Sequence, residues 1–294
     1  MTHIVSSAEA IEAALIRSTE APWPLLIVTD FDGTLAEGSR DPGAARVDPV
    51  AQRALRRLAR CGAERPGRLH LAVLTGRTVA DVARRVRVGG IEYLGDHGLQ
   101  SATLGRRGRP ARLIGRSDPA LERHHAVAET LAVGVARELA TEPWLFVERK
   151  GASVAFHVRQ ADDVPAARAR VLAAVATVER QAALGDHGLE PYRGRSVVDL
   201  RPRGAGGKRE AVARLLARTG AGGVLVLGDE LSDVDAFEAV IDARSSARLV
   251  GTTVAVHGTR PAPTELLERA DLALGSARAV GRLLSDLARH LGAR

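Results

Sequence analysis

The sequence predicts an α/β fold, a doubly wound parallel-sheet core with an inserted α+β domain. Short apolar runs alternate with helical patterns up to residue 105, and this alternation returns after residue 206. Between these stretches, helices and alternating strands follow one another without that order. Several core strands also end in acidic or hydroxyl side chains, as expected beside the ligand site of an open α/β sheet. We therefore expect a core of residues 1–105 and 206–294, and an inserted domain of residues 106–205.

Three buried strands are expected in the first part of the core. Residues 25–28, 69–74 and 91–94 are short apolar runs, typical of parallel strands covered on both faces. A helical pattern begins at Asp48-Pro49, where proline suits the first helical turn. A second helix is predicted from about residue 79 to residue 86, between the second and third strands.

The inserted domain begins where the alternation stops, near residue 105. Residues 105–115 are rich in glycine, arginine and proline, which predicts a turn-rich connection. A long helix is expected over residues 119–139 and another over 166–180. Residues 145–148 and 153–158 alternate like antiparallel strands, and residues 196–200 predict one more strand.

The core pattern resumes after the glycines of residues 204–207. We expect a helix over residues 208–218, a buried strand over 224–227 and a helix over 234–240. Two last strands are predicted at residues 252–256 and 272–274, and a closing helix at 277–291.

Composition excludes several classes of protein. The 294 residues are 45% hydrophobic and 26% charged, as in a globular protein of roughly two domains. Cys61 is the single cysteine, which excludes an intrachain disulfide and a cysteine-ligated zinc site. No apolar run approaches the roughly 18 residues of a membrane span, and the N-terminal residues do not resemble a signal peptide. We expect a cytoplasmic protein, a monomer, without a membrane partner.

The net charge of +7 does not by itself indicate a nucleic-acid partner, and we expect none. Aromatic residues are only 3% of the chain, and no basic run dominates, so a solvated surface or steering of an anionic substrate explains the charge better. Among the 42 basic residues, only Lys150 and Lys208 are lysines. Because the sequence otherwise uses arginine for its basic residues, each lysine indicates a position where a compact ammonium group is needed.

Three core strands end in polar segments that we expect to converge. They are Asp30-Phe31-Asp32-Gly33-Thr34, Thr75-Gly76-Arg77, and Gly228-Asp229-Glu230 with Asp233. The carboxyl ends of parallel strands share one edge of the sheet, where ligands bind. Glycines there let the backbone approach a ligand, and free N–H groups favour an anion.

This set of residues suits phosphoryl transfer. Packed carboxylates repel one another and need a cation, and oxygen donors without cysteine or histidine favour Mg²⁺. A carboxylate can accept a phosphoryl group, and a second one two residues away can act as acid and then as base. Lys208, which opens a helix, can neutralise the phosphate.

The three strand-terminal segments and Lys208 resemble the four motifs of the haloacid dehalogenase (HAD) superfamily, and the details are similar to the trehalose-6-phosphate phosphatase family. The resemblance covers about residues 25–291. Its local marks are Asp41-Pro42-Gly43-Ala44-Ala45-Arg46, Gly95-Asp96-His97-Gly98-Leu99, Glu148-Arg149-Lys150-Gly151, His157-Val158-Arg159, Ser196-Val197-Val198-Asp199-Leu200-Arg201-Pro202 and Gly228-Asp229-Glu230-Leu231-Ser232-Asp233-Val234-Asp235-Ala236-Phe237.

The resemblance implies a role for each site residue and makes the inserted domain a cap that recognises the sugar. Asp30 is the expected nucleophile and Asp32 the general acid and base. The other implied roles are phosphate binding by Thr75, Gly76 and Lys208; Mg²⁺ binding by Asp30, Asp229 and the Asp32 carbonyl, with Asp233 in support; and substrate binding by Arg77, His97, Glu148, Lys150 and Asp199. Arg77 has a second interpretation, as a brace for its loop.

Three departures from the family pattern stand out. Glu230 replaces an aspartate of the acidic motif, Arg209 replaces a glycine after Lys208, and Asp199 stands where the family usually has glutamate. Asp199 is one methylene shorter than glutamate, and this can withdraw a contact with a sugar hydroxyl. The change therefore bears on the identity of the substrate.

The resemblance implies an Mg²⁺-dependent phosphatase that hydrolyses trehalose 6-phosphate through an aspartyl phosphate. Several alternatives remain open. The substrate could be sucrose 6-phosphate, a glycosyl phosphoglycerate or a trehalose-like aminocyclitol phosphate. The chain could instead be a phosphomutase, or a non-catalytic sugar-phosphate sensor or partner of a synthase.

Overall fold

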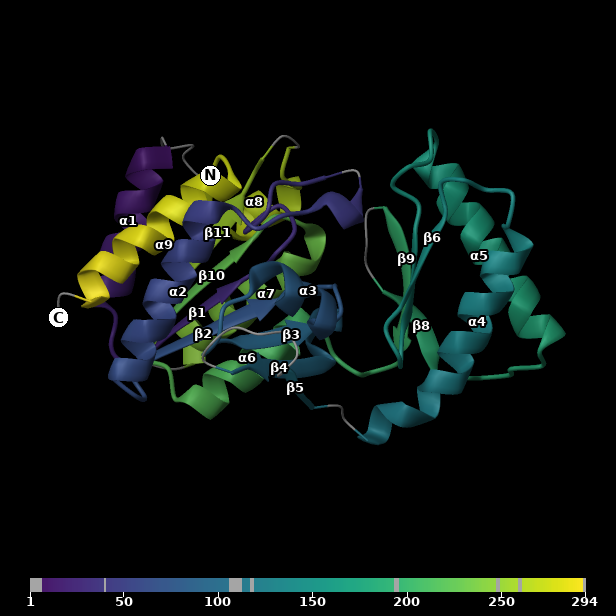
Figure 1. The fold of residues 1–294 in the computed structure, drawn as a ribbon, viewed down its shortest axis with the longest axis horizontal. Coiled ribbons are helices and arrows are strands. Elements are labelled where there is room, and N and C mark those ends of the chain that lie inside the picture. Colours follow the sequence, from purple (N-terminus) through teal and green to yellow (C-terminus); the bar gives the residue numbers. More distant parts are fainter. Residues whose placement is uncertain are drawn as a thin grey trace. The chain divides into compact units, whose positions relative to one another are not determined.

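The computed structural model describes residues 7–39, 41–105, 113–116, 119–192, 196–246, 249–258 and 261–292. The chain forms two compact units, one of Met1–Arg116 with Gly206–Arg294 and one of Ser117–Ala205 (Figure 1). The first boundary falls later than the expected residue 105, because strand β5 (Leu113–Arg116) pairs with the sheet of the larger unit. Residues 106–112 of the expected connection lie outside the described residues.

The larger unit contains an eight-stranded sheet of order β12-β11-β10-β1-β2-β3-β4-β5. The six strands from β12 to β3 run parallel to one another, whereas β4 pairs antiparallel with both β3 and β5. This topology confirms the predicted doubly wound α/β core. Its strands besides β5 are β1 (Leu25–Thr29), β2 (Leu69–Leu74), β3 (Glu92–Gly95), β4 (Gln100–Leu104), β10 (Gly223–Gly228), β11 (Val250–Val256) and β12 (Leu272–Leu274).

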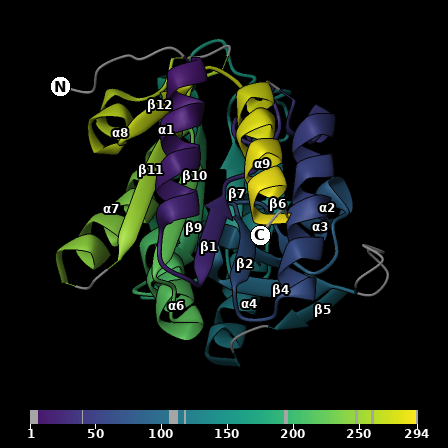
Figure 2. The same ribbon diagram turned by 90° about the vertical axis from the view of Figure 1, so that its left-hand side faces the viewer.

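Helices cover both faces of this sheet (Figure 2). On strand β1, Leu25 and Ile27 face one helical layer, whereas Leu26 and Val28 face the other, so these four consecutive residues are apolar. The first layer contains α1 (Ser7–Glu20), α2 (Pro49–Glu64), α3 (Val79–Val86) and α9 (Ala277–Gly292). The second contains α6 (Lys208–Thr219), α7 (Leu231–Ser246) and α8 (Thr264–Arg269).

Side-chain caps fix the beginning of two helices near the site. The Asp48 carboxylate accepts hydrogen bonds from the N–H groups of Val50 and Ala51, at 2.7 and 3.1 Å, at the start of α2. The Thr78 hydroxyl accepts one from Asp81 N–H at 3.3 Å at the start of α3. Two short 3-10 helices, η1 (Pro42–Ala44) and η2 (Asp96–Gly98), lie in the loops.

The smaller unit is an antiparallel four-stranded sheet of order β6-β7-β9-β8, with two long helices packed on one face. The expected helix over residues 119–139 begins as a 3-10 turn, η4 (Pro119–His124), and continues as α4 (His125–Glu138). The remaining elements are β6 (Phe146–Arg149), β7 (Val154–His157), α5 (Val164–Gln181), β8 (Leu189–Tyr192) and β9 (Val197–Pro202).

Alternation along these strands divides their side chains between two faces. Val154, Phe156, Val198 and Leu200 pack in the apolar core with α4 and α5. The intervening residues therefore belong to the other face of the sheet.

No helix in the described part of the chain is long and apolar enough to cross a membrane.

Candidate active site

The candidate site lies where three neighbouring parallel strands of the larger unit end. The order β10-β1-β2 places the carboxyl end of β1 between the other two. Asp30 follows β1, Thr75 follows β2 and Asp229 follows β10, so the topology brings these three residues to one edge of the sheet, as the sequence predicts.

Asp30 is a buried carboxylate held by a lysine from a distant part of the chain. Lys208 Nζ donates hydrogen bonds to Asp30 Oδ1 at 2.9 Å and to Asp233 Oδ1 at 2.8 Å, and the lysine is fully buried. Burial raises the pKa of Asp30 well above its usual range; Lys208 opposes this rise, and the carboxylates of Asp233 and Glu230 add to it. Burial alone would lower the pKa of Lys208, but Asp233 and Asp30 raise it well above its usual range.

Asp233 is tied to the backbone as well as to Lys208. Its Oδ2 accepts hydrogen bonds from the N–H groups of Asp229 and Glu230, at 3.0 and 3.1 Å. The carboxylate is therefore fixed at the start of α7, where an acidic residue also favours the helix dipole. The role of Asp233 in support of Mg²⁺ binding stays a prediction, and its carboxylate lies beside those of Asp30 and Asp229.

The Asp229 carboxylate packs on the backbone of Gly33. At Gly33 the φ angle is +79°, and a Cβ atom would lie 1.9 Å from Asp229 Oδ2, so only glycine fits there. Thr34 Oγ1 donates to Asp229 Oδ1 at 3.3 Å. Burial and the neighbouring Asp30 carboxylate raise the pKa of Asp229 well above its usual range.

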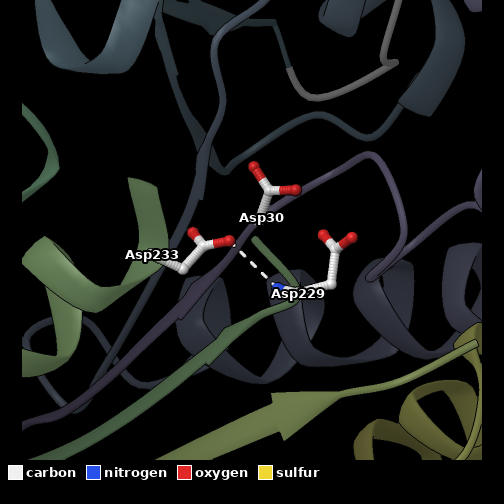
Figure 3. A group of neighbouring side chains, drawn as sticks. All are labelled: Asp30, Asp229 and Asp233. Carbon is white, nitrogen blue, oxygen red and sulfur yellow. Dashed lines mark hydrogen bonds between the residues drawn. The ribbon is translucent and has the colours of Figure 1, made fainter. Parts of the chain in front are cut away.

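Asp30, Asp229 and Asp233 together form a group that can hold a metal ion (Figure 3). One carboxylate oxygen from each lies within 4.8 Å of the others. The donor set is oxygen only, which fits a hard cation. Burial, together with repulsion between carboxylates, raises the pKa values of these three residues, and a cation would offset that repulsion. The expected contribution of Asp32 is its main-chain carbonyl, which stays a prediction, because this group consists of carboxylate oxygens.

The Asp32 carboxylate instead pairs with Arg77. Arg77 Nε donates to Asp32 Oδ2 at 2.5 Å, and Nη2 donates to Asp32 Oδ1 at 2.7 Å. Arg77 Nη1 donates to Asp81 Oδ2 at 2.7 Å. Sequence reasoning gave Asp81 no role. The signal that could have found it is the Asp81–Arg85 spacing, an i,i+4 pair on a predicted helix.

The segment from Thr75 to Arg77 rests on the loop that contains His97. His97 N–H donates to the Thr75 carbonyl at 2.9 Å, and Asp96 N–H donates to the Arg77 carbonyl at 2.8 Å. A Cβ atom at Gly76 would lie 2.8 Å from His97 Nε2, so His97 packs directly on the strand end. His97 is buried, and its expected contact with substrate stays a prediction.

The other expected sugar-contacting residues lie in the smaller unit. Strand register places Glu148, Ala155 and Asp199 in one row across β6, β7 and β9, on the face that α4 and α5 do not cover. Lys150, just after β6, donates from Nζ to Asp199 Oδ2 at 3.2 Å, and both side chains are buried. The Glu148 carboxylate lies 2.9 Å from His157 Nε2.

Comparison with known proteins agrees with this geometry. Residues 28–262 match the trehalose-phosphatase family. The chain is 38% identical over 217 residues to the trehalose-phosphate phosphatase of Mycobacterium avium, covering 72% of this chain and 50% of that protein. The chain thus spans about half the length of the curated relatives it matches.

Solved structures show the same fold. The C-terminal domain of a Candida albicans trehalose-6-phosphate phosphatase is similar over 98% of both chains, with a TM-score of 0.73 and 20% identity. A haloacid dehalogenase-like hydrolase from B. subtilis is similar over 88% of this chain and 98% of its own, with a TM-score of 0.51 and 16% identity. The fold is therefore HAD-like. Because the family match also covers most of the chain, including all four motifs, the chain belongs to the trehalose-phosphatase family.

Proposed function

We propose that the chain is an Mg²⁺-dependent phosphatase that hydrolyses trehalose 6-phosphate to trehalose and orthophosphate through an aspartyl phosphate. The observation that carries the proposal is the meeting of Asp30 with Asp229, Asp233 and Lys208 at one edge of the core sheet. Membership of the trehalose-phosphatase family supports both the reaction and the substrate class.

The first half-reaction transfers the phosphoryl group to Asp30. A carboxylate oxygen of Asp30 attacks phosphorus in line, and the bond between phosphorus and the sugar oxygen breaks. Asp32 gives its proton to the departing sugar oxygen. Thr75 and Lys208 hold the phosphoryl oxygens, and Lys208 is suited to this because its ammonium already lies 2.9 Å from Asp30.

The second half-reaction returns Asp30 to its free form. Asp32, now a carboxylate, takes a proton from water as the water oxygen attacks phosphorus, and the bond between phosphorus and Asp30 breaks. Orthophosphate leaves, and Asp32 has regained its proton. The stabilisation is electrostatic and positional, because the charged groups are already in place before reaction.

Asp30, Asp229 and the Asp32 carbonyl, supported by Asp233, are the groups that would hold Mg²⁺. When bound, the ion supplies positive charge that offsets the repulsion between the phosphoryl oxygens and these carboxylates.

In this proposal the larger unit performs the phosphoryl transfer and the smaller unit recognises the sugar. Glu148, Lys150 and Asp199 are the proposed sugar contacts. Glu148 and Asp199 share one face of the smaller sheet, and Lys150 donates to Asp199, which supports this assignment, because a few precisely placed polar groups orient a bound ligand.

Phosphate release from a panel of sugar phosphates, with and without Mg²⁺, tests the proposal. We expect release from trehalose 6-phosphate at a higher kcat/KM than from sucrose 6-phosphate, a glycosyl phosphoglycerate or an aminocyclitol phosphate. Activity that needs no divalent ion contradicts the metal assignment. Release from none of the esters contradicts the phosphatase assignment and favours a sensor, whereas isomerised sugar phosphate without orthophosphate indicates a mutase.

A further inference from the structure

Arg77 directs its three guanidinium nitrogens to two carboxylates of its own unit. Two of them contact Asp32 at 2.5 and 2.7 Å, and the third contacts Asp81 at 2.7 Å. The Arg77 side chain is only 10% exposed, whereas that of Asp32 is 36% exposed. The guanidinium therefore lies on the protein side of the Asp32 carboxylate, which keeps contact with solvent on another side.

A second arginine, Arg85, contacts Asp81, the carboxylate that pairs with Arg77. Asp81 Oδ2 also accepts a hydrogen bond from Arg85 Nε at 2.9 Å, one helical turn further along α3. Arg85 Nη1 donates to the carbonyls of Ala45 and Gly43, at 2.7 and 3.1 Å. Asp32, Arg77, Asp81 and Arg85 thus form a chain of alternating charges, which ends at the backbone of residues 41–46. The proposed mechanism gives this segment of the chain no role.

We propose that Arg77 is a positioning residue that orients Asp32 for proton transfer, and that Asp81 and Arg85 hold Arg77 in place. Each carboxylate oxygen has two lone-pair sites. The two parallel hydrogen bonds from Arg77 fix the plane of the Asp32 carboxylate and leave one site on each oxygen for the proton in transit. A lysine ammonium cannot make this planar, paired contact. The inference rests on the proposed function, because it gives Asp32 the role of acid and base.

This role differs from the substrate contact that the sequence suggests for Arg77. A substrate-binding arginine would direct donors to the ligand, whereas these donors are directed to Asp32 and Asp81. It also differs from a purely structural brace, because one partner of the guanidinium is the proposed proton donor itself.

The leaving group of the substrate tests the inference. Proton donation matters most when the departing oxygen is strongly basic, so a misplaced acid costs more rate on phenyl phosphate than on dinitrophenyl phosphate. For Arg77→Lys we expect kcat/KM to fall about 30-fold on phenyl phosphate and less than about threefold on dinitrophenyl phosphate, with p-nitrophenyl phosphate between them. These esters carry no sugar, and kcat/KM reports the step that forms the aspartyl phosphate.

Four further variants make this test more specific. Asp32→Asn should show the same steeper dependence of kcat/KM on the leaving group. The double variant Arg77→Lys/Asp32→Asn should behave like Asp32→Asn alone, because both changes act through the Asp32 carboxylate. Arg85→Gln should shift the dependence in the same direction by a smaller factor. Its matched control is Arg84→Gln, an exposed neighbour on α3 whose Nε donates to the Ala80 carbonyl, and this variant should leave the series unchanged.

Each other outcome overturns the inference. An equal loss on all three aryl esters in Arg77→Lys would show that Arg77 only stabilises the fold. A loss confined to trehalose 6-phosphate, with an unchanged aryl series, would show that it contacts the sugar. A wild-type protein that hydrolyses no ester would overturn the proposed function itself, and with it the reason to assign Asp32 a proton.

Discussion

At the scale of single residues, Asp30 is the position of the site where a change of side-chain chemistry should matter most. Its carboxylate is buried, accepts a hydrogen bond from Lys208 at 2.9 Å and faces Asp229 and Asp233 across a distance that suits a cation. Asp30→Asn keeps the shape but removes the nucleophile, because an amide oxygen does not form a stable acyl phosphate.

We expect Asp30→Asn to lower kcat for trehalose 6-phosphate by at least about a thousandfold, measured as phosphate release. The matched control is Asp242→Asn on α7, where an exposed carboxylate pairs with Arg209 on the surface. Turnover of Asp30→Asn within about tenfold of the wild type would remove Asp30 from the role of nucleophile.

Asp229 allows a test of the metal site that does not depend on activity. The raised pKa values of Asp30 and Asp229 mean that the metal-free folded state holds protons more tightly than the unfolded state does. Stability of the metal-free protein therefore falls as pH rises from the unfolded carboxylate pKa through the higher folded values. A bound cation compensates the negative charge of these buried carboxylates, so its stabilising effect should grow as pH rises and they ionise.

We expect Mg²⁺ at about a hundred times its Kd to stabilise the fold by about 2.7 kcal/mol, which corresponds to a rise in Tm of about 5–10 °C. Asp229→Asn removes one buried charge, so it should raise the Tm of the metal-free protein and abolish most of the rise with Mg²⁺. Thermal unfolding with Mg²⁺ and with a chelator measures both. An equal Mg²⁺-dependent rise in the variant would exclude Asp229 as a ligand.

At the scale of elements, Lys208 connects helix α6 to the ends of β1 and α7. Its ammonium is fully buried between Asp30 and Asp233, at 2.9 and 2.8 Å. Lys208→Met keeps the volume of the side chain but leaves two buried carboxylates without their cation. Breaking a buried ion pair in this way costs about 3–5 kcal/mol.

We expect urea unfolding of metal-free Lys208→Met to show a loss of about 3 kcal/mol or more near pH 8, and a smaller loss near pH 5.5. The sign follows because the two carboxylates can take up protons at acidic pH, which removes the unpaired charge. Arg209→Met, on the exposed side of the same helix, is the control and should cost about 1 kcal/mol or less. A loss that does not depend on pH would mean that packing, not charge, holds Lys208.

The elements that the sequence predicts well are those with a uniform environment. Strands β1, β2 and β10 are covered on both faces, so they appear as short apolar runs. Strand β4 is not evident from the sequence, because it lies near the edge of the sheet and only Ala102 and Leu104 among its residues are buried. Helix α1 was missed because its buried side is formed by small residues, Ala10 and Ala14, which give a weak periodic signal.

The candidate site, too, can be predicted from the sequence only in part. The meeting of Asp30 with Asp229 and Lys208 follows from strand order, and strand order follows from the alternation of strands and helices. The pairing of Asp32 with Arg77 depends on side-chain torsions and on a brace from α3, neither of which a linear pattern records. The convergence of the strand ends can therefore be predicted from the sequence, whereas the contacts of Arg77 with Asp32 and Asp81 cannot.

At the scale of the whole molecule, the two units carry different parts of the proposed reaction. The groups proposed for phosphoryl transfer lie in the larger unit, whereas Glu148, Lys150 and Asp199 lie in the smaller one. Binding energy from a remote group lowers the barrier only for substrates that carry that group. The division therefore predicts that changes in the smaller unit separate a sugar phosphate from a simple aryl phosphate.

Lys150→Met tests this separation. Lys150 is buried and donates to Asp199 at 3.2 Å, so the variant loses a charged donor while it keeps an unbranched side chain. We expect kcat/KM for trehalose 6-phosphate to fall by the equivalent of about 2–4 kcal/mol, and that for p-nitrophenyl phosphate to change by less than about threefold. Arg149→Met is the control: Arg149 is half-exposed and pairs with Glu129 on the surface, so both substrates should react as before.

A second variant separates sugar recognition from folding of the smaller unit. Lys150→Met leaves the buried Asp199 carboxylate beside a thioether, which can destabilise this unit by itself. The double variant Lys150→Met/Asp199→Asn removes that charge, so its thermal unfolding should return toward that of the wild type. Its activity on trehalose 6-phosphate should stay low, because the lysine donor is still missing and Asp199, another proposed sugar contact, has lost its charge. If the double variant instead regains activity along with stability, Lys150 serves the fold of the smaller unit and not the sugar. If Lys150→Met loses both substrates equally while stability is unchanged, Lys150 acts on the phosphoryl group that both share.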